Sequence, residues 1–188
     1  MNQHRCGALV VLGAILFASP TIAGPDYSER GKPDIDLYAL MSGKCSTLNI
    51  AGRDFRCKAV AYFHSEKGRA SFTVAVDDPA DGSHVIAFSG EYGRRTQQDL
   101  YVLAVDRMEL NSKDRPKLDG LPVPALEISD GMCRQNGSFA RLQVSSVSCS
   151  AIDKKGRQYR LQFESDGTPP TVRRVRASAP TIRQDPYL

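Results

Sequence analysis

Residues 57–76, CKAVAYFHSEKGRASFTVAV, contain two apolar runs separated by a short polar segment. In the second run Phe72, Val74 and Val76 alternate with other residues, as in a strand with one buried face. The first run, residues 57–64, carries apolar side chains on both faces, and the SEKG that follows it is typical of a turn. The stretch predicts a β-hairpin whose first strand is covered on both sides, as in a sandwich or a closed barrel.

A second stretch, CSAIDKKGRQYRLQF at residues 149–163, repeats this pattern. Each stretch runs from Cys-x-Ala through Lys-Gly-Arg to an aromatic residue and alternating apolar positions, and each is preceded by Gly-x-Cys. Two interpretations remain open: a duplicated unit, or the independent use of the same turn residues in a hairpin protein. A duplication predicts two related β-units, residues 34–110 and 122–167, joined by a linker at residues 111–121.

Four cysteines lie in the predicted mature chain: Cys45, Cys57, Cys133 and Cys149. None of them has the two-residue spacing of redox or zinc motifs, and an even number in an exported chain indicates two disulfides. Spacing by itself does not choose among the possible pairings. A duplication would place one bridge in each unit, Cys45–Cys57 and Cys133–Cys149.

The rest of the body also consists of short apolar runs separated by turn residues, which favours an antiparallel all-β domain over residues 34–167. In RQYRLQF the side chains of Tyr159, Leu161 and Phe163 are expected to point inward. A bulge is expected at Ser145–Ser146. The fold predicted is a sandwich or a barrel-like sheet.

Residues 34–43, DIDLYALMSG, place Leu37, Leu40 and Met41 at helical spacing, with Gly43 positioned as a helix terminator. The favoured interpretation is a short helix, so the domain is expected to carry one or two short helices. An alternating strand over the same residues is the alternative.

Both ends of the chain read as segments outside the domain. Residues 1–23 have the layout of a cleavable signal peptide, with an apolar run shorter than the roughly 20 residues that span a bilayer. Residues 24–33 are expected to form a flexible leader, and residues 168–188 a basic, proline-rich and disordered tail. No transmembrane segment is expected after cleavage, and the predicted location is the periplasm or the outside of a bacterial cell.

The net charge of the whole chain is +4. Removal of residues 1–23 takes away one basic residue, Arg5, which leaves 24 basic and 21 acidic residues and a charge of +3. The tail from Thr168 to Leu188 carries four arginines and one aspartate, also +3, so the body is balanced. This distribution argues against a nucleic-acid partner, and it suggests that the tail could contact an anionic surface.

Catalytic and metal-binding signals are sparse. The chain lacks a Gly-x-Ser-x-Gly elbow and a His-Glu-x-x-His motif, and His64 and His84 are interpreted as structural residues near strand ends. Asp77, Asp78 and Asp81 could offer oxygen ligands to calcium, but DDPADG is more typical of a turn. No catalytic residue, metal site or cofactor is predicted.

Residues 88–98, FSGEYGRRTQQ, are the candidate binding segment. Tyr92, Arg94 and Arg95 lie there among glycines, and a loop of this composition suits anionic or carbohydrate partners because arginine offers a rigid donor fork. A solvated hairpin loop is the simpler interpretation.

The sequence favours an exported, disulfide-stabilised domain that acts by binding a protein, an envelope polymer or a small ligand, with an inhibitor as one form. The alternatives are a secreted hydrolase that uses carboxylates and a passive component of the cell envelope. A cleft with two facing acids of raised pKa would favour the hydrolase.

Overall fold

The computed structural model describes residues 35–65 and 68–176. The predicted signal peptide and leader, and the tail beyond Arg176, lie outside this range. The described part is all-β and antiparallel, as predicted. It contains no helix that is long and apolar enough to cross a membrane.

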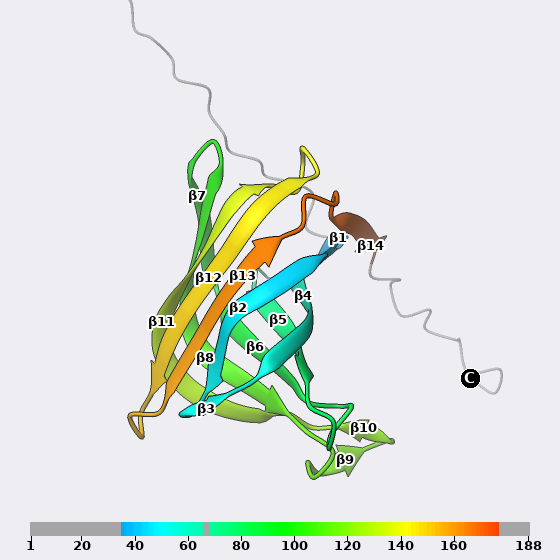
Figure 1. Ribbon diagram of the computed structural model, residues 1–188, viewed down its shortest axis with the longest axis vertical. Helices are drawn as coiled ribbons and strands as arrows, with labels where there is room; N and C mark the ends of the chain where they lie inside the picture. The colour runs from blue at the N-terminus through cyan, green and yellow to red at the C-terminus, as the bar shows by residue number, and fades with distance from the viewer. Residues whose placement is uncertain (1–34, 66–67, 177–188) are drawn as a thin grey trace, which may run out of the picture. The chain divides into compact units, whose positions relative to one another are not determined.

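The described residues form strands that are numbered in chain order (Figure 1). Their bounds are β1 Ile35–Met41, β2 Gly43–Ile50, β3 Arg53–Asp54, β4 Arg56–His64, β5 Ala70–Asp77, β6 Val85–Gly90, β7 Tyr92–Gln97, β8 Leu100–Asn111, β9 Lys117–Leu118, β10 Leu121–Pro122, β11 Ala125–Ser138, β12 Gln143–Asp153, β13 Gln158–Ser165 and β14 Thr171–Arg176.

The first strand closes the sheet. Only Ser42 separates β1 from β2, so residues 35–50 act as one bent strand. On one edge this strand pairs with β4 and β3, and on the other edge it pairs with β14 and β13. Figure 1 shows β2 lying between β13 and the β3–β4 strand. Because the first strand pairs with the last, the main sheet is closed and barrel-like.

Glycine lets this strand lie close to β13. A Cβ added at Gly43 would collide with the carbonyl oxygen of Glu164 on β13, so a larger residue would push the two backbones apart. Gly131 has the same role on β11, where an added Cβ would collide with the carbonyl oxygen of Ser150. Gly131 also lies at a register shift between β11 and β8, where the ladder bends.

Side chains fill the interior of the closed sheet. Counting β1–β2, β3–β4, β6–β7 and β13–β14 once each, together with β5, β8, β11 and β12, gives eight strands. A barrel of this size is just wide enough for side chains to fill it. The predicted inward residues of β5 and β13 are all at most 2% exposed, and they are Phe72, Val74, Val76, Tyr159, Leu161 and Phe163.

The predicted helix at residues 34–43 is wrong. The structure places β1 there, with Ala39 and Met41 facing the core and Tyr38 and Leu40 more than a third exposed. Burial that alternates along the chain is typical of a strand. The strand forms in place of the predicted helix because β1 has a pairing partner on each edge. No helix occurs anywhere in the described residues.

The predicted cover on both sides of residues 57–64 is incomplete. Val60 and Tyr62 are buried in the interior, whereas Phe63 on the outer face is 38% exposed. The predicted bulge on β12 is present, because Asn136 pairs with Ser146 while Gly137 pairs with Val144, which leaves Ser145 unpaired.

Both predicted disulfides are present, and each joins the two strands of a hairpin. Cys133 and Cys149 lie directly opposite each other on β11 and β12 and face the interior. The Cys45–Cys57 bridge joins β2 to β4, between the β2–β3 and β1–β4 ladders. The repeated Gly-x-Cys lies on the first strand of each hairpin, β2 and β11, and the repeated Cys-x-Ala lies on the second, β4 and β12. Duplication itself remains a prediction.

The first part of the predicted tail belongs to the sheet. Residues 171–176 form β14, which pairs with β1 from Leu40↔Thr171 to Ile35↔Arg176. Arg173 and Arg174 are exposed on this strand. The predicted linker at residues 111–121 is largely a turn leading into the small β9–β10 pair.

A chain that ends at Gly167 is expected to be much less stable than a chain that ends at Arg176, because only the shorter one loses β14 and leaves β1 with an open edge. Thermal unfolding followed by circular dichroism would compare the two truncations with the full chain. Equal unfolding midpoints for the two truncations would contradict the role of β14 in closure.

Mild reduction of the folded protein is expected to open Cys45–Cys57 before Cys133–Cys149. Cys133 and Cys149 are 0% and 3% exposed, whereas Cys45 and Cys57 are only partly buried, and thiol exchange requires access to a sulfur atom. Alkylation of freed thiols followed by mass spectrometry gives the order. Earlier labelling of Cys133 would show that burial does not control reduction here.

Candidate functional site

The candidate segment at residues 88–98 is strand rather than loop. β6 ends at Gly90, and β7 continues as a hairpin with β8 through a turn at residues 98–99. A Cβ added at Gly93 would collide with the Tyr101 side chain, so the glycine lets this ring lie against β7. The predicted loop was wrong because pairing with β8 overrides the turn-like composition of the segment.

Strand geometry separates the two arginines. Consecutive strand residues point to opposite faces, so Arg94 and Arg95 do not form a joint cationic site. The Arg95 guanidinium donates through Nη1 to the carbonyl oxygens of Gln98 and Gly137, both at 3.3 Å, and fastens the hairpin to β11. Tyr92 pairs through its backbone with Ala104, and its side chain lies outside the described part.

Arg94 instead shares the outer face with an arginine that the sequence analysis missed. Val102 of β8 pairs with Arg94 on one side and with Arg134 of β11 on the other. Both arginines are exposed, and within the described residues neither side chain has a hydrogen-bond or ion-pair partner. Two strand spacings separate their backbones, roughly 10 Å. In a strand, a charged residue next to an inward cysteine is expected to point outward, and Arg134 follows Cys133 directly. That signal gives the direction of the Arg134 side chain, but only the strand register places it near Arg94.

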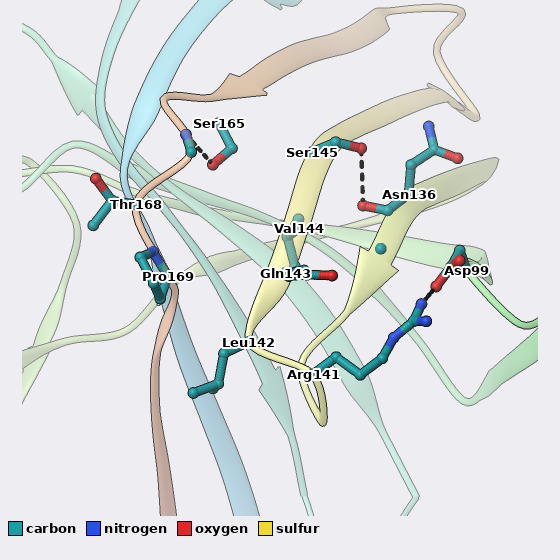
Figure 2. Close-up of a pocket in the computed structure, with 12 residues that line it drawn as sticks. Asp99, Asn136, Arg141, Leu142, Gln143, Val144, Ser145, Ser165, Thr168 and Pro169 are labelled. Atoms are coloured by element: carbon teal, nitrogen blue, oxygen red, sulfur yellow. Dashed lines mark hydrogen bonds and ion pairs between the residues drawn. The ribbon is translucent and has the colours of Figure 1, made fainter.

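An open depression lies at the same end of the sheet (Figure 2). Its volume is about 720 Å³, and it lies between the β11–β12 turn and the segment 165–169. Figure 2 shows Arg141 extended toward Asp99, with which it forms an ion pair. Because that pair neutralises the arginine, the depression offers less attraction to an anion than the surface formed by Arg94, Val102 and Arg134, here called the arginine face.

Aromatic side chains close the interior next to β7. Phe139, from the β11–β12 turn, stacks on Tyr62 with ring centroids 5.0 Å apart. The Tyr62 hydroxyl donates to the Tyr101 hydroxyl at 3.1 Å and lies 3.2 Å from Nδ1 of His64. Burial raises the pKa of both tyrosines, so their hydroxyls remain protonated at neutral pH. This cluster packs the end of the barrel.

No described carboxyl group with a resolved pKa shift has a raised pKa. Asp153 is 5% exposed and accepts bonds from the Arg157 Nε at 2.6 Å and the Tyr159 hydroxyl at 3.0 Å. Burial by itself would raise its pKa, but these bonds and those from the backbone of Arg157 and Lys155 lower it to about 2. Among the described residues every resolved shift of a carboxyl pKa is downward, at Asp78, Asp81, Asp106, Asp153 and Asp166.

The acidic turn after β5 is organised by its own hydrogen bonds. Asp81 accepts from the backbone and hydroxyl of Ser83 and from the backbone of Lys113, and Asp78 lies 3.1 Å from Nδ1 of His84. Within the described residues no group of three or more His, Cys, Asp or Glu side chains could hold a metal ion. The turn therefore ties β5 to the segment that follows β8.

Asp153→Asn is expected to destabilise the protein at neutral pH and much less in acid. Because the folded-state pKa of Asp153 is depressed, the carboxylate contributes stability above its unfolded pKa of about 3.9, and this is lost as the pH falls toward about 2. Chemical unfolding at a series of pH values from neutral to about 2 measures the difference in unfolding free energy between the variant and the parent protein. Asp114→Asn, in an exposed turn, is the control. If the loss of unfolding free energy in Asp153→Asn were the same at every pH in this range, the assigned bonds would be contradicted.

Comparison with known proteins adds no relative to this picture: no family model, curated protein or solved structure matches the chain.

Proposed function

We propose that this chain is an exported binding domain that holds an acidic region of a partner protein on its arginine face. The observation that carries the proposal is a pair of exposed guanidinium groups, Arg94 on β7 and Arg134 on β11, which flank Val102 of the intervening strand β8 and have no partner among the described residues. Arginine without an internal carboxylate keeps its full charge and its fork of donors for a ligand.

The surroundings of these arginines favour a protein partner. Val102 lies between them, and Met132, two residues from Arg134 on the same strand, is 40% exposed. Apolar side chains beside exposed charges suit a polypeptide, which offers both carboxylates and apolar side chains, better than a polymer that is uniformly charged. The crosslinked sheet supports binding further, because a surface that is already ordered loses little entropy when it binds.

The same observations favour binding over hydrolysis. The described carboxyl groups with resolved shifts are held ionised, and a general acid needs a raised pKa. Export and location outside the cytoplasm belong to this proposal as well. Two disulfides and the layout of residues 1–23 support them.

The double change Arg94→Glu/Arg134→Glu is expected to weaken binding of a short peptide of alternating Glu and Val by roughly tenfold, because it reverses two exposed positive charges that attract the peptide's carboxylates. Fluorescence anisotropy at low salt measures the affinity, and added salt should weaken it. A peptide with Gln in place of Glu tests the need for carboxylates.

The matched control is Arg56→Glu/Arg174→Glu. Both control residues are exposed arginines, on β4 and β14, and the double change alters net charge by the same amount. An equal loss of binding in this control, or equal binding of the Glu and Gln peptides, would refute the arginine face as the site.

A further inference from the structure

The open edge of β7 suggests how the partner binds. β6 pairs with β5 on one side and β8 on the other, and its last residue, Gly90, pairs with Ala70 at the beginning of β5. β7 continues beyond that point, and β8 is its only strand partner in the described part of the chain. Gly93 through Gln97 are exposed. Among the described residues no strand covers the edge of β7 that faces away from β8.

The backbone of this edge is suited to a further strand. Tyr92 to Arg95 pair with β8 in regular register, and the register shifts only between Arg95 and Gln97. In an antiparallel ladder alternate residues direct their N–H and C=O groups toward the neighbouring strand, so the other residues direct theirs toward the open edge. An extended peptide could satisfy these groups, as in other cases of strand addition.

Charge selects the kind of strand. Two copies of β7 placed edge to edge would bring arginines close together, which is unfavourable for self-pairing. A strand with carboxylates would instead place an acidic side chain next to Arg94, which is otherwise unpartnered in the described part. Arg134 lies two strands from β7, so it would add longer-range attraction rather than contact the added strand.

We infer that an extended acidic segment of a partner protein adds to β7 as a further strand, with a carboxylate beside Arg94. This inference rests on the proposed function and adds the mode of binding. The backbone of β7 fixes the position of the segment, and the arginines favour acidic sequences over neutral or basic ones.

Methylation of peptide backbone nitrogens tests this inference without changing charge. Two versions of the Glu-Val peptide are needed, each carrying N-methyl groups on one of the two alternating sets of amides. In an added strand one set faces β7 and the other faces solvent. Strand addition predicts that one version loses at least about tenfold in affinity while the other binds like the parent peptide.

The outcomes separate the two levels of the proposal. If both methylated peptides bind like the parent while Arg94→Glu/Arg134→Glu still weakens binding, the acidic partner lies across the arginine face and strand addition is wrong. If the parent peptide does not bind, or binds the double variant equally well, the proposed function fails as well. Slower amide exchange in the complex at alternate residues of β7, those whose N–H groups face the open edge, is the independent sign of strand addition.

Discussion

Backbone pairing along both edges of residues 35–50 is the constraint on which the structure depends. This strand joins the first described strands to the last, so nearly all strands of the main sheet gain two neighbours. Gly43, at the junction of β1 and β2, lets this strand lie close to the backbone of β13. Closure also explains the interior, since side chains that point inward from every strand meet in one packed core.

Turns and ion pairs then fix the ends of the strands. Arg69, immediately before β5, forms a bidentate bond to Asp106 and a further bond to Glu91, and Arg157 bonds to Asp153 and Glu127. Both arginines come from the Lys-Gly-Arg segments that the sequence repeats. In each case the guanidinium bonds to a carboxylate two strands away, Asp106 on β8 from the start of β5 and Glu127 on β11 from the start of β13, so the repeated segment has a repeated structural role.

The sequence predicted features that depend on local pattern. Alternation located the inward side chains of β5 and β13, and the two disulfides followed from the repeated cysteine pattern. Pairings between strands distant in the sequence could not be predicted from these local patterns. Residues 34–43 have helical spacing, and only the neighbours β4 and β14 make them a strand. The sequence analysis missed Arg134 for the same reason, because its proximity to Arg94 arises from the register of β7, β8 and β11.

The pairing of β14 with β1 also determines the order in which the fold can form. Cys45 and Cys57 are 12 residues apart, so their hairpin can assemble early, whereas Ile35 must wait for Arg176. During synthesis from the N-terminus, β1 therefore has an unsatisfied edge until almost the whole domain is available. Contacts that distant in sequence slow folding. This protein is therefore more prone to aggregate while its sheet is still open than after the barrel has closed.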